Sequence, residues 1–410
     1  MIAAKVENTK NAWLVNYPSH WEVLRIKNLF QEMDSRSETG SEELLSVSHY
    51  TGVTLKRESL ENEDDHLSNA ESLVGYKLVA KNDLVINIML AWNGSLGISP
   101  HNGMTSPAYC VYRIRGENNP EYFGYLFTTN LFKAKFRRNS TGIIDSRLRL
   151  YTDKFFSIFT IVPPKVEQDE IVRYIKVQEE KINLFIQKKQ RFIELLKEQR
   201  LSIVNIAVTN EGENWIWLRL KDIVTVNDEA LTEKTEEDYL IKYIDIGNVN
   251  SYGDIAEIQE YTFKEAPSRA RRIVKMGDVI ISTVRTYLKA ITLIESDNDN
   301  LIASTGFAVL RPKEDVLPEY LNFALRAEYF IASVIKNSYG VSYPAINSTT
   351  LSSLKIVIPK STKEQQKLIN KIKTETEIID TAITKTEREI ELIREYKEAM
   401  ISEAVMGERK

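Results

Sequence analysis

The stretch VPPKVEQDEIVRYI, residues 162–175, has a close counterpart in VIPKSTKEQQKLIN, residues 357–370. In both, proline ends an apolar run, a Glu-Gln pair follows, and apolar residues then recur at helical spacing. Proline interrupts a strand but is tolerated at the start of a helix. Each stretch therefore predicts a strand that ends where a long helix begins, and the chain contains this junction twice.

The similarity between the two halves extends far beyond this junction. The other matching blocks are WEVLRIKNLF (21–30) with WIWLRLKDIV (215–224), KNDLVIN (81–87) with MGDVIIS (276–282), SPAYCVYR (106–113) with STGFAVLR (304–311), PEYFGYLF (120–127) with PEYLNFAL (318–325), NSTG (139–142) with NSYG (337–340), and IELLKEQRLSIVNIAV (193–208) with IELIREYKEAMISEAV (390–405). The offset between matching blocks stays between 194 and 198 residues. Such a constant register indicates a tandem duplication.

Each copy begins with a region of predicted strands. Apolar runs such as KLVAKNDLVINIML (77–90) and RRIVKMGDVIISTV (271–284) are interrupted by Asn, Asp and Gly, which favour turns. Trp21 and Trp215 begin the two regions at equivalent places, and we interpret both as core residues. Short helices are predicted near the two PEY sequences.

A long helix closes each copy, over about 165–207 in the first and 362–405 in the second. Pro163 and Pro164 precede the first helix. In the second, Thr362 and Gln365 have the spacing of a capping box, in which each side chain bonds the other residue's backbone.

Both long helices carry a narrow apolar seam bordered by charged residues. In the first it comprises Ile171, Ile175, Ile182, Phe185, Phe192, Leu196 and Ile203. In the second it comprises Leu368, Ile372, Ile379, Ile383, Ile390, Ile393 and Met400. A single narrow stripe needs a partner helix, and the other copy's helix is the economical choice. Lys189, Gln178 and Thr386 interrupt the heptads, so an amphipathic helix lying on its own globular region is the alternative.

These patterns predict an α+β fold with two repeated α/β domains and two long helices in an antiparallel coiled coil, with pseudo-twofold symmetry. The expected division is a first domain (1–164), a central helix (165–208), a second domain (209–359) and a C-terminal helix (360–410). DNA has the same approximate symmetry. Two related domains held at a fixed distance are suited to contacting two half-sites of a duplex.

Composition excludes several other classes. The 410 residues are 43% hydrophobic and 27% charged, with a net charge of −4, which argues against a protein that coats DNA through overall positive charge. No apolar run reaches the length of a membrane span, no signal peptide is evident, and the single Cys110 has no disulfide partner within the chain. We therefore expect a cytoplasmic protein without membrane contact.

Motifs for chemistry are absent from the sequence. The adenine-methyltransferase motif Asn/Asp-Pro-Pro-aromatic has no match, the nearest strings being NNPEY (118–122) and VPPK (162–165). No Gly-rich loop with Gly-Lys-Ser/Thr is present for ATP. Histidines 20, 49, 66 and 101 have no metal-binding spacing with the lone cysteine. We predict no catalytic, cofactor or metal site.

Basic residues nevertheless gather locally, where they would neutralise phosphates while neighbouring Asn and Ser side chains reach base edges. The candidates in the first copy are Trp92, Asn93, Lys133, Lys135, Arg137, Arg138, Asn139, Ser140, Arg147 and Arg149. Those in the second are Arg269, Arg271, Arg272, Arg285, Lys289, Asn337, Ser338 and Tyr343. A solvated basic face is the alternative for any single arginine. Simple packing is the alternative for Trp92, which precedes an Asn-Gly turn.

The tandem pattern resembles the specificity subunit of type I restriction–modification systems over residues 15 to 407. The resemblance lies in the repeated domains and in their closing elements, NSTGIIDSRLRLYTDKFFSIFTIVPPKVEQ (139–168) and NSYGVSYPAINSTTLSSLKIVIPKSTKEQ (337–365). The second copy has Lys360 where the first has Pro164, but Pro359 still ends the strand.

The resemblance implies a non-catalytic, sequence-specific DNA-recognition subunit whose two target-recognition domains each read one half of a split target. It implies double-stranded DNA as ligand and two modification subunits, which carry S-adenosylmethionine and methylate one adenine in each half-site. It further implies restriction subunits that use ATP with Mg in the full complex, and no cofactor bound by this chain. Two alternatives remain: a coiled-coil interaction scaffold without sequence-specific DNA binding, and an enzyme with degenerate motifs.

Overall fold

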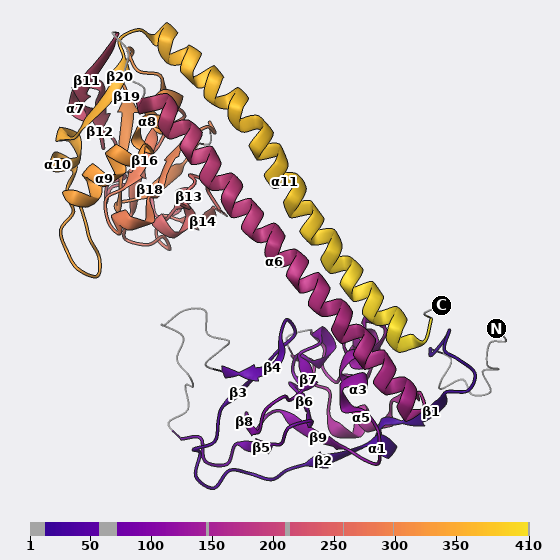
Figure 1. The fold of residues 1–410 in the computed structure, drawn as a ribbon. Helices are drawn as coiled ribbons and strands as arrows, with labels where there is room; N and C mark the ends of the chain where they lie inside the picture. Colours follow the sequence, from indigo (N-terminus) through magenta and orange to yellow (C-terminus); the bar gives the residue numbers. More distant parts are fainter. Residues whose placement is uncertain are drawn as a thin grey trace. The chain divides into compact units, whose positions relative to one another are not determined.

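The computed structural model describes residues 13–56, 72–144, 147–209, 214–256, 258–297 and 299–408. The chain forms two compact units, one of Met1–Gln187 with Glu389–Lys410 and the other of Lys188–Arg388. Each unit thus contains one copy of the repeat together with parts of both long helices (Figure 1).

In the first unit a short ribbon joins the two ends of the repeat, because β1 (Glu22–Arg25) pairs antiparallel with β10 (Phe159–Val162). An antiparallel sheet of order β2-β9-β6-β7 follows. Its strands are β2 (Phe30–Met33), β9 (Cys110–Ile114), β6 (Leu84–Ile86) and β7 (Leu96–Ile98). Two further ribbons are β3 (Leu45–Ser48) with β4 (Gly52–Leu55), and β5 (Lys77–Val79) with β8 (Gly103–Thr105). The helices are α1 (Ile26–Leu29), η1 (Ala91–Asn93), α3 (Pro120–Phe127), α4 (Asn130–Asn139) and α5 (Thr152–Ser157).

The second unit repeats this order of elements. Its end ribbon is β11 (Trp215–Arg219) with β20 (Lys355–Pro359), and its first sheet has the equivalent order β12-β19-β16-β17. Those strands are β12 (Val224–Val226), β19 (Phe307–Pro312), β16 (Val279–Ser282) and β17 (Ile291–Leu293). The helices are α7 (Leu220–Ile223), η3 (Ile246–Asn248), η4 (Thr286–Leu288), α8 (Pro318–Leu325), α9 (Glu328–Lys336) and α10 (Ser348–Ser353).

The second unit differs in its second sheet, which has four strands in the order β14-β13-β18-β15. These are β14 (Gln259–Thr262), β13 (Leu240–Ile244), β18 (Leu301–Ser304) and β15 (Ala270–Ile273), and only β13 and β18 run parallel. The shared elements confirm the predicted duplication of an α/β domain.

Aromatic side chains dominate the core of the first unit. Phe123, Phe127, Phe132 and Phe155 are fully buried there, and their rings lie in edge or tilted contact with neighbouring rings. Trp21, predicted to be a core residue, is 5% exposed. Trp215 is partly buried against the equivalent core of the second unit. Each tryptophan meets the tyrosine of the PEY sequence edge-on.

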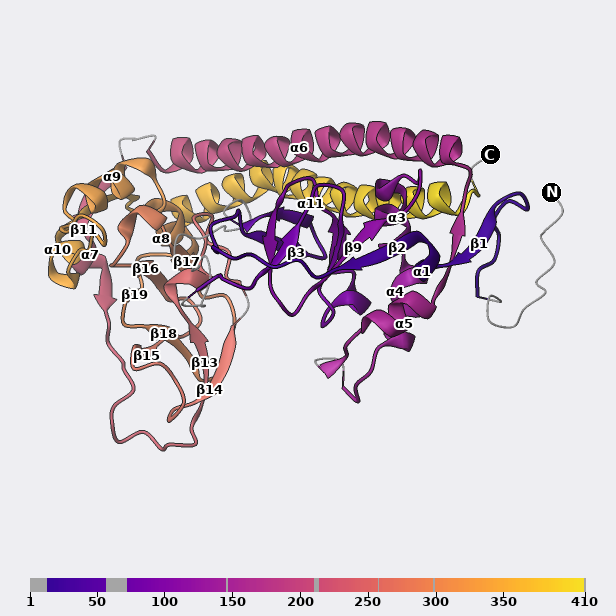
Figure 2. The same cartoon turned by 90° about the horizontal axis from the view of Figure 1, so that it is seen from below.

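The long helices α6 (Lys165–Thr209) and α11 (Thr362–Met406) pack against each other in both units (Figures 1 and 2). In the first unit, Val172 and Ile175 of α6 share a core with Val405 of α11. In the second, Val204 and Val208 near the end of α6 share a core with Ile369 near the start of α11. The guanidinium of Arg200 also bonds the carboxylate of Asp380 at 2.8 Å. Because the start of each helix meets the end of the other, the pair is antiparallel, and the alternative of separate helices is wrong.

The seam of α11 is confirmed, since all seven of its predicted residues are buried or partly buried. The seam predicted for α6 is wrong at two positions. Phe185 and Phe192 are 41% and 45% exposed, whereas the next residues, Ile186 and Ile193, are partly buried. One residue corresponds to a rotation of about 100° around a helix. The predicted spacing places Phe185 and Phe192 in the seam, whereas the structure places Ile186 and Ile193 there.

The glutamine of each repeated Glu-Gln pair ties the long helix to the loop before α3 or α8. The fully buried Gln168 donates from Nε2 to the Pro163 carbonyl at 2.8 Å and accepts from the Asn119 backbone N–H at 2.7 Å. Gln365 makes the equivalent bonds to the Pro359 carbonyl and the Leu317 N–H.

The predicted capping box at Thr362 is therefore wrong. Ser361 caps α11 instead: its carbonyl accepts from the backbone N–H of Gln365, and its hydroxyl accepts from that of Lys363. The Gln365 side chain points to the loop before α8, where it bonds the Leu317 N–H, rather than back to the helix start.

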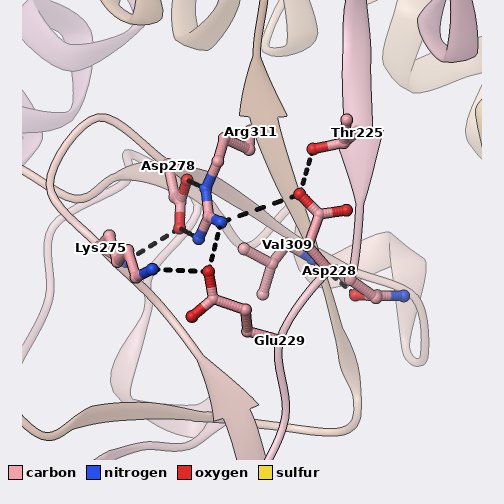
Figure 3. Close-up of polar contacts among 8 residues, drawn as sticks. Thr225, Asp228, Glu229, Lys275, Asp278, Val309 and Arg311 are labelled. Atoms are coloured by element: carbon pink, nitrogen blue, oxygen red, sulfur yellow. Dashed lines mark hydrogen bonds and ion pairs between the residues drawn. The ribbon is translucent and has the colours of Figure 1, made fainter.

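A bidentate ion pair is duplicated at the turn before the central strand of each first sheet. The buried carboxylate of Asp278 accepts from Nε and Nη2 of Arg311, both at 2.8 Å, and from the Lys275 backbone N–H (Figure 3). Glu229 extends this network to Arg311 and Lys275, and hydrogen bonds from Lys275 and then Arg311 lower the pKa of its carboxyl. Asp83 and Arg113 make the same pair in the first unit.

Candidate nucleic-acid interface

A hairpin loop projects from the equivalent place in each unit. In the second unit it connects α9 to α10 and extends away from the sheets (Figure 1). Tyr339 and Ala345 exchange backbone hydrogen bonds at 2.9 Å across it. In the first unit the loop connects α4 to α5, and Thr141 and Arg149 exchange the equivalent bonds at 2.8 and 2.9 Å.

The Asn-Ser pair at the base of each loop ends the preceding helix. Asn139 Nδ2 donates to the Lys135 carbonyl and Ser140 Oγ to the Phe136 carbonyl, both at 2.8 Å. Asn337 and Ser338 bond the last turn of α9 in the same way. These side chains satisfy helix-end carbonyls. Their predicted contact with bases would therefore replace an existing bond.

Several of the first unit's candidates come together where α4 meets η1. The guanidinium of Arg137 lies over the Trp92 ring, 5.3 Å from its centroid, and the indole N–H donates to the Met89 carbonyl at 3.2 Å. Asn93 is the last residue of η1, and a Cβ added to the next residue, Gly94, would lie 2.8 Å from Cε of Lys133. Trp92 therefore packs against its neighbours, as the alternative interpretation has it, and Arg137 above its ring is exposed at the surface.

The remaining basic candidates of the first unit lie around this cluster. Lys135 Nζ lies 4.7 Å from the centroid of the Trp13 ring, and burial lowers its pKa. Arg138 and Arg147 are exposed, and Arg149 donates to the Leu148 carbonyl at 2.9 Å. Arg147 and Arg149 belong to the hairpin loop itself.

In the second unit the equivalent surface is formed by η4 and the hairpin loop. Arg285 and Lys289 flank η4, both exposed and both with left-handed backbone, at φ 51° and 54°. The Arg285 guanidinium lies 4.8 Å from the centroid of the Tyr343 ring, which is 64% exposed. Non-glycine residues with positive φ are strained, and such strain clusters at functional sites.

The cluster at 269–272 occupies the edge strand β15 and its start. The carbonyl of Arg269 accepts a hydrogen bond from the backbone N–H of Thr305. The next residue in that turn, Gly306, accepts through its carbonyl from the backbone N–H of Thr283, which lies just before η4. Arg271 lies over the Phe263 ring at 4.7 Å, and Nε of Arg272 is buried without a hydrogen-bond partner. The Arg269 backbone is thus joined to the turn beside η4, whereas the Arg271 side chain packs locally against Phe263.

Known proteins resemble this chain in sequence and in fold. Residues 212–392 match the family model of the type I restriction modification DNA specificity domain. The specificity subunit of the type I restriction enzyme MjaVIII of Methanocaldococcus jannaschii is 22% identical over 437 aligned positions, which cover 98% of this chain and 96% of that subunit. The HindI specificity subunit of Haemophilus influenzae is 33% identical over 112 residues, 26% of this chain and 24% of that one. A chain from a solved type I R-M system covers 95% of this chain at a TM-score of 0.63 and 13% identity, with 98% of its own length matched.

The chain belongs to the specificity subunits of type I restriction–modification systems. A specificity subunit carries the DNA specificity of its system and is itself non-catalytic. S-adenosylmethionine and ATP are used by the partner subunits of such systems. The predicted family is confirmed.

The histidines and the acidic side chains are not among the candidate interface residues. Among the described residues of this specificity subunit, no group of His, Cys, Asp and Glu is arranged to hold a metal ion. His20 bonds Glu167, and the His49 ring lies 3.7 Å from that of Tyr50, whereas His66 lies outside the described residues. Within the described ranges, no helix has both the length and the hydropathy to cross a membrane.

Several exposed apolar side chains of the candidate interface are not among the residues predicted from the sequence. Ile143 and Val341 are fully exposed in the two loops, and Tyr287 and Tyr339 are 52% and 75% exposed in the second unit. They are aliphatic or aromatic, whereas most of the predicted DNA-binding residues are basic or polar. The only sequence signal is a β-branched residue directly after the glycine of the NSTG and NSYG repeats.

Proposed function

We propose that each unit of this specificity subunit reads one half of a split DNA target through its hairpin loop and the adjoining 3₁₀ helix. The observation that carries the proposal is the repeated interface: a projecting loop beside an arginine stacked on an aromatic ring, present once in each unit. Arginine neutralises phosphates and reads guanine edges, and loops on a rigid scaffold are suited to the major groove.

Two modification subunits would bind this chain and methylate one adenine in each half-site, with restriction subunits completing the complex. The long helices offer a surface for the modification subunits. Leu184, Phe185, Phe192 and Leu195 of α6 are between 41% and 50% exposed, on a helix whose seam is already occupied by α11. Exposed apolar side chains of this kind favour a protein partner. We place the complex in the cytoplasm, where its DNA substrate lies.

We assign one half-site to each of the two domains predicted from the sequence. Residues 21–164 of the first domain would read one half-site and the second domain, residues 209–359, the other, while the paired helices set the length of the unread gap. The adenine in each half-site would leave the base stack to reach the modification subunit's active site.

Exchange of residues 21–164 for the first domain of another specificity subunit tests this proposal. We expect the sequence of one half-site to change while the other half and the gap stay the same. Methylated adenines mapped by single-molecule sequencing, in cells with and without the exchange, give the readout. A change in both halves, or in neither, contradicts the assignment of one half-site to each unit.

A further inference from the structure

The hairpin loops present fully exposed aliphatic side chains at equivalent positions. Ile143 is 100% exposed and Val341 101%, and each directly follows a glycine with positive φ, Gly142 or Gly340. Isolated exposed apolar residues are common on protein surfaces. These two are unusual because both copies retain a β-branched aliphatic residue here, although the next residues differ, as IDS in one loop and SYP in the other.

The stems that carry these side chains are fixed in place. In the second unit, Ser338 Oγ lies 3.0 Å from Thr286 Oγ1, and the Ile346 N–H donates to the Thr283 carbonyl at 2.8 Å. Ile346 itself is buried. In the first unit, Leu150 is buried and its N–H donates to the Ile88 carbonyl at 2.9 Å. A tip held on such a stem loses little conformational freedom when it enters a ligand.

Charge indicates which ligand the tips enter. The first loop carries Arg147 and Arg149 beside its tip, and the second has Arg285 stacked on Tyr343, with Lys289 across η4. In sequence, the first loop has one acidic residue, Asp145, against Arg147 and Arg149, and residues 340–344 of the second loop include none. A positively charged rim around an apolar point is complementary to duplex DNA, whose charged backbone encloses apolar stacked bases.

We propose that Ile143 and Val341 act as wedges, each entering the base stack of its half-site beside the adenine that is extruded for methylation. The proposal rests on the function proposed above and adds the residues that open the duplex. DNA-bending architectural proteins use apolar side chains such as Ile and Leu to unstack base steps. Here the wedge would occupy the space next to the extruded base and so favour the open state.

The test uses the complete modification complex and two duplexes that carry its mapped target. In the first, 2-aminopurine replaces the methylated adenine of one half-site and reports extrusion. The second has adenine in both half-sites and reports methylation. Fluorescence of 2-aminopurine rises when the base leaves the stack. We expect Val341→Ala to lower the extruded fraction and the single-turnover methylation rate in the second unit's half-site about tenfold, because it removes two carbons that the base stack would bury. Ile143→Ala, which removes three, should lower them about fiftyfold in the other half-site.

Three controls separate the outcomes. Each variant should leave the opposite half-site unchanged, and Leu240→Ala, which truncates a 63% exposed side chain at the first residue of β13, should leave both unchanged. If Val341→Ala retains extrusion within twofold, the wedge is refuted. If its defect disappears when the thymines of that half-site are replaced by uracils, Val341 contacts thymine methyl groups and the wedge is again refuted. If the wild-type complex methylates without sequence preference, the proposed function itself fails, an outcome distinct from both.

Discussion

Replacing Gln168 with alanine tests the physical role of the repeated junction. The side chain is fully buried and makes three hydrogen bonds, to the Pro163 carbonyl, the Asn118 Oδ1 and the Asn119 N–H, at 2.8, 2.9 and 2.7 Å. A typical hydrogen bond contributes about 1 kcal/mol net, and a partner left buried without one loses about 1–3 kcal/mol. Because the Asn119 and Pro163 backbone groups would both lose their partner, we expect a local destabilisation of about 2–4 kcal/mol.

Native-state hydrogen exchange measures this directly, because the Asn119 amide is itself a donor to Gln168. The expected destabilisation corresponds to exchange roughly 30-fold to 900-fold faster at the start of α3. Gln187→Ala is the matched control, since Gln187 is an exposed glutamine of the same helix. Gln365→Ala should accelerate exchange of the Leu317 amide and leave Asn119 unchanged. A change below threefold at Asn119 in Gln168→Ala would refute the reasoning.

Three further predictions follow from the structure. Asp278→Ala should destabilise the second unit by about 2–4 kcal/mol in urea unfolding, because it leaves the partly buried Arg311 without its bidentate partner. Lys264→Ala, which removes an exposed ion pair with Glu237, is the control and should change stability by less than about 1 kcal/mol. Arg285→Ala should weaken DNA binding by the complex and reduce the slope of log K against log salt by about 1, with Lys264→Ala showing no change in slope. Inserting four residues into α6 lengthens the helix by about 6 Å. Methylation mapping should then show the gap between half-sites widened by about one or two base pairs, and an unaltered gap would contradict the role of the long helices in setting that gap.

The tandem repeat, the long helices and their antiparallel pairing were predictable because each depends on a pattern along the chain. A 194–198-residue offset is visible in the letters, and apolar periodicity requires a partner for each narrow seam. The capping box was predicted wrongly because the spacing of Thr362 and Gln365 is only a local signal, and a loop nearly fifty residues earlier competes for the same side chain.

The sequence by itself therefore determined the family, the duplication and the order of elements. The tertiary structure alone decided which side chains meet: that Ile186 and Ile193 face the seam in place of the neighbouring phenylalanines, that Arg137 stacks on Trp92 and Arg285 on Tyr343, and that two aliphatic side chains stand exposed at the loop tips. Periodicity reports the average environment of a segment, whereas stacking and exposure depend on backbone paths that bring together residues 45 to 58 positions apart.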